Sequence, residues 1–95
     1  MATYMLVQIR GVSDPAGFGE YRQQAGTTME RYGGVLRVAG AEPDVREGDW
    51  RPTLVIIEFP NAEQARAWYD SPEYQPLKVL RQRCAAVDLL FVDGI

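Results

Sequence analysis

The sequence lacks histidine altogether. Histidine is the commonest general base near neutral pH, the commonest zinc ligand and the usual proximal ligand of haem iron. Its absence excludes Ser-His-Asp and Cys-His catalytic sites. We therefore expect no metal and no cofactor, so any chemistry must rely on carboxylates, tyrosines, arginines, backbone groups or a bound reactive molecule.

Cysteine, basic runs and long apolar runs are also scarce. The single cysteine, Cys84, excludes an internal disulfide, fits a reducing compartment and falls on an apolar stripe, where we expect a buried, inert thiol. Ten basic and 13 acidic residues give a net charge of -3, with no basic run that could follow a phosphate backbone. No apolar run approaches the ~20 residues of a membrane helix, and the N-terminus lacks the pattern of a secretory signal. These features predict a soluble, cytoplasmic protein that binds neither nucleic acid nor membrane.

The 95 residues, 46% of them hydrophobic, predict a single domain spanning 1–95. Hydrophobic periodicity, helix caps and Gly/Pro breaks divide it into strands and helices. We expect strands at Thr3–Ile9, Val35–Ala39, Thr53–Phe59 and Ala86–Val92, a turn at Gly11–Ser13, a helix from Asp14-Pro15 to Gly33-Gly34, and a second helical region from Asn61 that breaks at Asp70-Ser71-Pro72 and resumes after Pro76. This β-α-β-β-α-β order predicts an α+β, ferredoxin-like fold: a four-stranded antiparallel sheet with two helices on one face.

The first predicted helix combines an apolar stripe with several glycines. The stripe consists of Phe18, Tyr21, Ala25, Met29 and Tyr32. Gly17, Gly19 and Gly26 each cost the helix up to ~1 kcal/mol relative to alanine. They either allow close approach to the sheet or a ligand, or are tolerated on the surface. Trp50, just before the third strand, is expected to cover the core.

Several runs resemble one family, the domain of unknown function 1330. The matching residues are Asp14-Pro15 with Tyr21, Tyr32-Gly33-Gly34, Val55 to Pro60, Ala67-Trp68-Tyr69, Ser71 to Tyr74 and Leu80-Arg81. The resemblance covers nearly the whole chain and implies membership of the dimeric α/β-barrel superfamily, whose sheets pair across a dimer. Relatives there include cofactor-independent monooxygenases, lactone isomerases and haem-degrading enzymes. The missing histidine argues against the haem branch, and the family itself has no assigned activity.

Glu58 is the one charged residue in the apolar third strand. In this fold the third strand runs antiparallel beside the first, which brings Glu58 towards Tyr4. A carboxylate beside an apolar cavity holds its proton more tightly and can carry protons, so Glu58 and Tyr4 are the candidate catalytic residues. The alternative is a structural pair between Glu58 and an arginine or a helix start.

Five further residues are candidates for ligand binding. Arg81 and Arg37 carry planar guanidinium groups that can neutralise an anionic ligand, although a surface ion pair is the alternative for each. Trp68, Tyr69 and Tyr74 can line a pocket for an aromatic molecule, as the monooxygenase relatives suggest. At their spacing, however, core and dimer packing is the favoured alternative.

Two classes of function remain open. The chain is either a metal-free enzyme that performs proton or oxygen chemistry on a small aromatic or polyketide-like molecule, or a non-catalytic small-molecule-binding or structural dimer. A carboxylate that reaches a real cavity favours the enzyme, and a filled interior favours the alternative. In both cases we expect a homodimer, because two helices cover one sheet face while the third strand is apolar on both.

Overall fold

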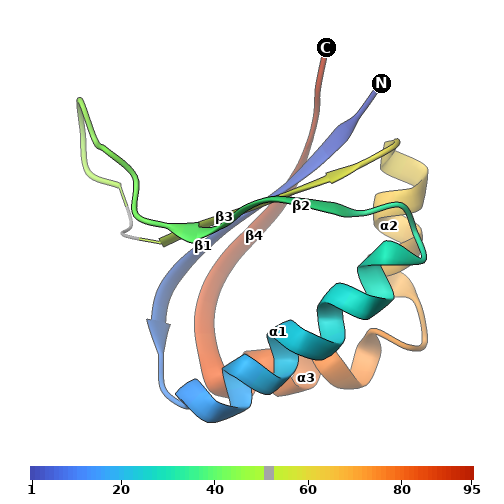
Figure 1. Cartoon of the computed structure of the whole chain (residues 1–95), viewed down its shortest axis with the longest axis horizontal. Helices are drawn as coiled ribbons and strands as arrows, with labels where there is room; N and C mark the ends of the chain where they lie inside the picture. Colours follow the sequence, from blue (N-terminus) through green and yellow to red (C-terminus); the bar gives the residue numbers. More distant parts are fainter. Residues whose placement is uncertain (51–52) are drawn as a thin grey trace.

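A four-stranded antiparallel sheet in the order β2-β3-β1-β4 organises the chain (Figure 1). The computed structural model describes residues 1–50 and 53–95. Its elements are β1 (Thr3–Val12), α1 (Pro15–Glu30), β2 (Val35–Ala41), β3 (Thr53–Phe59), α2 (Ala62–Asp70), α3 (Gln75–Cys84) and β4 (Ala85–Asp93). These helices lie on one face of the sheet, which confirms the predicted ferredoxin-like architecture. Within the described residues, no helix is both long and apolar enough to cross a membrane.

Side-chain caps start two of the helices as the sequence predicts. The Asp14 carboxylate accepts a hydrogen bond from the Gly17 amide at 3.1 Å, and the Asn61 side chain accepts one from the Gln64 amide at 2.8 Å. The second helical region is two separate helices, α2 and α3. Pro76 lies in the first turn of α3, where its missing N–H costs no intrahelical bond, so it begins a helix.

The first strand is longer than predicted. Gly11 and Val12, expected in a turn, continue β1 and pair with Ala86 and Ala85 of β4. A shift in register between Ile9 and Gly11 accommodates them, as a β-bulge does. The error arose because the glycine marks a bulge within the strand.

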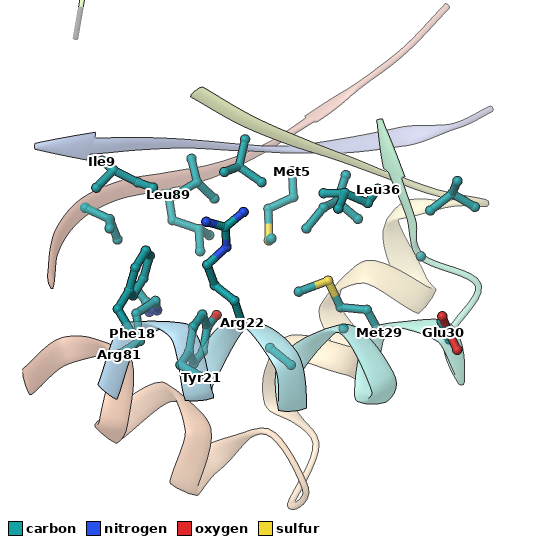
Figure 2. A pocket seen from close by; sticks show the side chains of 18 residues that line it. Met5, Ile9, Phe18, Tyr21, Arg22, Met29, Glu30, Leu36, Arg81 and Leu89 are labelled. Atoms are coloured by element: carbon teal, nitrogen blue, oxygen red, sulfur yellow. The ribbon is translucent and has the colours of Figure 1, made fainter. Parts of the chain in front are cut away.

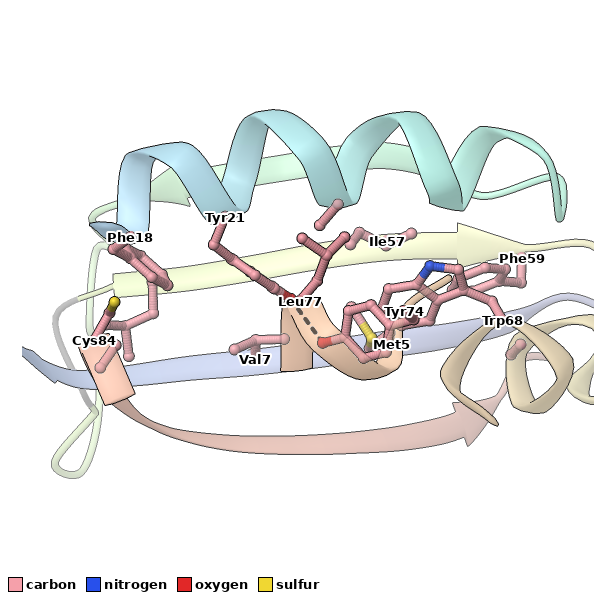
Figure 3. Close-up of a cluster of buried hydrophobic side chains, with 14 residues drawn as sticks. Met5, Val7, Phe18, Tyr21, Ile57, Phe59, Trp68, Tyr74, Leu77 and Cys84 are labelled. Atoms are coloured by element: carbon pink, nitrogen blue, oxygen red, sulfur yellow. Dashed lines mark hydrogen bonds between the residues drawn. The ribbon is translucent and has the colours of Figure 1, made fainter. Parts of the chain in front are cut away.

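The core lies between the sheet and the helices (Figure 3). Trp68 and Tyr74 are fully buried at its centre, with ring centroids 4.1 Å apart, and Phe59 of β3 lies 5.8 Å from Trp68. Aromatic pairs of this kind contribute about 0.5–1.5 kcal/mol beyond their buried area. Trp50 does not cover this core, because 53% of its surface is exposed.

The opposite sheet face carries apolar side chains that no helix covers within residues 1–50 and 53–95. Alternation along the strands directs Met5 and Ile57 to the helices and Leu6 and Ile56 to this open face, where they are direct cross-strand neighbours. Leu90 of β4 is paired with Leu6 and is 52% exposed. The predicted second apolar face is therefore present.

Candidate functional site

A cavity of about 430 Å³ separates α1 from the sheet (Figure 2). It exists because α1 packs chiefly against α3, leaving space between its inner stripe and the strands. Small-molecule sites usually have volumes of about 300–1,000 Å³ and mainly apolar walls. The apolar side chains of this wall are Met5, Val7, Ile9, Phe18, Ala25, Met29, Val35, Leu36, Val55, Ile57, Val87 and Leu89.

Arg81 places a positive charge in this apolar wall. It occupies a core-facing position of α3, four residues after Leu77 and three before Cys84, and is only 6% exposed. Its Nε is buried without a hydrogen-bond partner, and the ion pairs found among residues 1–50 and 53–95 do not include Arg81. An ion removed from water costs several kcal/mol unless a counter-charge compensates it. The neighbours of the Arg81 guanidinium group include the Tyr74 and Tyr21 phenols, which are neutral. The cavity therefore offers an anion a cation that forms no ion pair with the described residues.

A pair of tyrosine hydroxyls adds a second polar feature. The Tyr21 hydroxyl, from the cavity wall, lies 2.8 Å from the Tyr74 hydroxyl, and either oxygen can be the donor (Figure 3). Burial raises the pKa of Tyr21 above its ordinary value. Burial also raises the pKa of Tyr74, although the hydrogen bond with Tyr21 and the charge of Arg81 oppose this shift. Both phenols stay protonated at neutral pH, so they can donate hydrogen bonds but are poor general bases.

The structure places Glu58, Tyr4 and Arg37 away from this cavity. Tyr4 lies directly opposite Glu58 in the β1–β3 register, so the predicted proximity is present. Both residues belong to the open sheet face, and none of the three lines the cavity. The Glu58 carboxylate instead accepts a hydrogen bond from Arg37 Nε at 3.2 Å, which is the structural pairing considered as the alternative.

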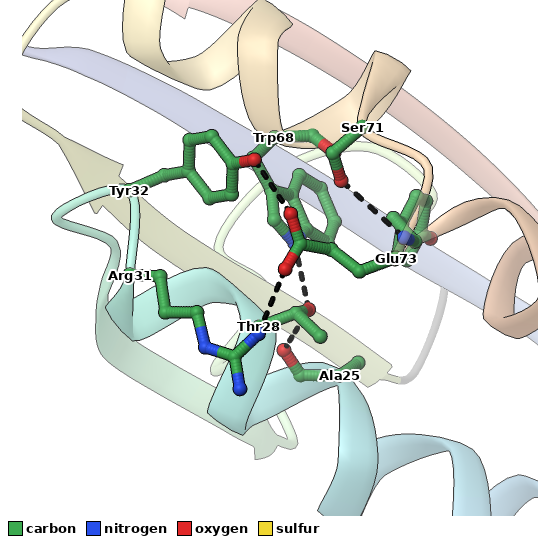
Figure 4. Close-up of polar contacts among 8 residues, drawn as sticks. Ala25, Thr28, Arg31, Tyr32, Trp68, Ser71 and Glu73 are labelled. Carbon is green, nitrogen blue, oxygen red and sulfur yellow. Dashed lines mark hydrogen bonds and ion pairs between the residues drawn. The ribbon is translucent and has the colours of Figure 1, made fainter.

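None of the three aromatic candidates lines the cavity: Trp68 and Tyr74 lie in the core cluster, and the partly buried Tyr69 packs against it. Trp68 Nε1 donates to the Thr28 hydroxyl at 2.9 Å (Figure 4), and Tyr69 packs edge-on against Trp68. Of these three residues, Tyr74 forms a hydrogen bond with a residue of the cavity wall, Tyr21. Of the predicted ligand-binding residues, the structure brings only Arg81 into the cavity wall.

Sequence reasoning missed Tyr21, Arg22 and Glu30 as cavity residues, and it left open whether Gly26 approaches a ligand. A signal existed for Tyr21, because a tyrosine on an apolar stripe needs a partner for its hydroxyl. No comparable signal marked Arg22, which lies beside that stripe. Gly26 was one of three glycines, and the sequence does not distinguish it from Gly19.

A polar cluster holds α1 to the connection between α2 and α3 (Figure 4). The Tyr32 hydroxyl and Arg31 Nη1 each donate to the Glu73 carboxylate at 2.7 Å. The hydrogen bond from Tyr32, followed by that from Arg31, holds the pKa of Glu73 below its usual value. This contact joins the C-terminal end of α1 to the segment that precedes α3.

These features define a ferredoxin-like α+β domain with an apolar cavity that contains a buried arginine. The chain belongs to the family described as a domain of unknown function (DUF1330), whose sequence profile matches residues 2–95. The family resemblance stated from the sequence runs is thereby confirmed. Comparison with curated proteins gave no significant match.

Solved structures show the same fold at low sequence identity. A protein of unknown function from Rhodopseudomonas palustris is 18% identical, with a TM-score of 0.76 over 99% of this chain and 82% of that one. The cofactor-independent oxygenase SnoaB from Streptomyces nogalater is 16% identical, with a TM-score of 0.63 over 99% and 91% of the two chains. A dimeric ferredoxin-like protein of unknown function from Jannaschia sp. CCS1 is 10% identical, with a TM-score of 0.69 over 99% and 100%.

Proposed function

We propose that this protein binds a small, flat, mainly apolar molecule with an acidic group in the cavity between α1 and the sheet. The observation that carries this proposal is the buried Arg81, which lacks an ion-pair partner within the described part of the chain. A carboxylate, sulfonate, phenolate or enolate next to its guanidinium group would offset the cost of burying that charge. The apolar wall would hold the rest of the molecule.

A fluorescent anion and its uncharged counterpart test this assignment. We expect 8-anilinonaphthalene-1-sulfonate (ANS) to bind more tightly than N-phenyl-1-naphthylamine, which has the same rings without the sulfonate. The difference should disappear in Arg81→Met. Equal affinities of the wild type for the two dyes would contradict the role of Arg81.

Two glycine variants test whether ANS occupies the cavity. An added Cβ meets no atom within 4 Å at either Gly26 or Gly19, but Gly26 lines the cavity and Gly19 does not. Both changes to leucine improve helix propensity alike. Gly26→Leu should weaken ANS binding, whereas Gly19→Leu should leave it unchanged. If both variants bind ANS as the wild type does, the dye lies elsewhere.

Catalysis is the finer possibility within this proposal. A nearby cation favours the ionised form of a phenol or enol, which is the electron-rich form that proton or oxygen chemistry on an aromatic or polyketide-like molecule would use. Support comes from Arg81 and from a fold shared with a cofactor-independent oxygenase. The visible phenolate band of 4-nitrophenol offers a test, since binding should lower the apparent pKa of the dye in the wild type but not in Arg81→Met.

We also propose that the chain forms a homodimer through its open sheet face. The apolar side chains of that face include Leu6, Ile56, Leu90 and Val92, and Leu90 and Val92 are about half exposed. Contiguous apolar surface of this kind usually marks an interface, and the same face of a second copy covers it by two-fold symmetry. Light scattering on a sizing column should report about twice 10.7 kDa. A stable monomer at micromolar concentration would contradict the proposal.

The dimer gives Glu58, Tyr4 and Arg37 a different environment from that of Arg81. They lie on the face that the partner would cover, so a catalytic role for Glu58 requires a ligand at the interface rather than in the cavity. Glu58→Gln separates the two sites. It should leave ANS binding in the cavity intact, and a loss of binding without dissociation of the dimer would favour the interface.

A further inference from the structure

The cavity opens between α1 and the edge strand β2. Its deep wall is buried: Met5 and Ile57 are each 2% exposed. The exposed residues of the wall instead come from the outer side of α1, where Arg22 lies, and from β2, where Leu36 is 57% exposed. Since β2 is a sheet edge, a small molecule can reach the cavity there without displacing the core.

Arg22 spans this opening. Figure 2 shows its side chain extending from α1 towards the sheet, and its Nη2 donates to the carbonyl oxygen of Ala39 in β2 at 3.2 Å. Arg22 lines the cavity and forms no ion pair with the residues described here. One solvent-exposed hydrogen bond thus holds it across the mouth, and such a bond breaks and re-forms at little cost.

We propose that Arg22 is a gate for the cavity, which releases Ala39 to admit an acidic ligand and then closes behind it. This inference rests on the proposed function, because it assumes that a ligand occupies the cavity. The alternative is that Arg22 only satisfies the Ala39 carbonyl oxygen at the sheet edge, as a cap, without controlling entry to the cavity. The two roles predict different binding kinetics. Removing a gate raises both the association and the dissociation rate constants, whereas removing a cap changes stability alone.

Stopped-flow fluorescence with ANS distinguishes these cases. Arg22→Met keeps an apolar side chain of similar length but cannot donate to Ala39. Arg66→Met on α2 is the matched control. Arg66 is exposed and lies outside the cavity wall, and its replacement by methionine removes the same charge. We expect Arg22→Met to raise both rate constants by about two- to tenfold relative to Arg66→Met, as for the loss of one exposed hydrogen bond, with a smaller change in Kd.

The possible failures can be told apart. The gate is wrong if ANS binds the wild type in an Arg81-dependent manner but both rate constants are the same in Arg22→Met and Arg66→Met. It is also wrong if only the dissociation rate rises, since Arg22 is then a fixed contact to the ligand. If ANS does not bind the wild type, or if Arg81→Met leaves its affinity unchanged, the proposed function fails and the gate fails with it.

Discussion

Replacing Arg81 with methionine should stabilise the fold while it removes anion binding. The substitution deletes a cation that is 6% exposed and has no ion-pair partner within the described residues. Methionine has a similar length and extends the apolar wall of the cavity. Replacing buried ions with apolar side chains is often neutral or stabilising by about 1–4 kcal/mol. Because the cavity is open to water on one side, we expect the lower part of that range, about 1–2 kcal/mol.

Thermal unfolding and dye titration measure the two effects together. For a domain of this size, that gain should raise Tm by about 5–10 °C at a fixed protomer concentration. The lost contact between the guanidinium and the sulfonate should lower ANS affinity by about ten- to a hundredfold. Arg83→Met, on the exposed side of the same helix, removes the same charge and should change neither quantity appreciably.

One result would refute this reasoning about Arg81. If Arg81→Met lowered the free energy of unfolding by more than about 1 kcal/mol while Arg83→Met did not, Arg81 would be a structural residue satisfied by its surroundings. Unchanged ANS affinity in a stabilised Arg81→Met variant would show that the burial cost is real but that the anion binds elsewhere.

The remaining predictions concern the two sheet faces, the polar cluster and the thiol. Ile57→Asp should prevent folding because Ile57 is 2% exposed in the core, whereas Ile56→Asp should yield a folded monomer by light scattering; the reverse pattern would overturn the assignment of the faces. The hydrogen bond from Tyr32 holds the pKa of Glu73 below its usual value, so its stabilising effect is present above the usual pKa of a glutamate and is lost as the pH falls through the lowered pKa. Glu73→Gln should therefore unfold more easily than the wild type at neutral pH but alike in strong acid, and parallel pH profiles in chemical denaturation would contradict this. Cys84→Ala should leave ANS affinity unchanged because Cys84 does not line the cavity, and a lost affinity in a folded variant would refute the inert thiol.

Local sequence signals were reliable where a short run determines the structure. Asp14 and Asn61 cap the helices that the sequence predicted, because an N-cap bond joins residues three apart. The apolar run of β3 predicted its bounds, Thr53–Phe59, as the structure has them. The bulge at Gly11 was missed because it depends on pairing with Ala86, which is far away in the sequence.

The sequence alone therefore determined the order of the elements, the ferredoxin-like fold, the family and the presence of a second apolar sheet face. Tertiary structure decided which face is which, because β3 is apolar on both sides and its alternation cannot say whether Ile56 or Ile57 meets the helices. That choice also placed Glu58 on the open face. The cavity and the burial of Arg81 depend on the distance between α1 and the sheet, which is set by packing between α1 and α3 and leaves no local trace in the sequence.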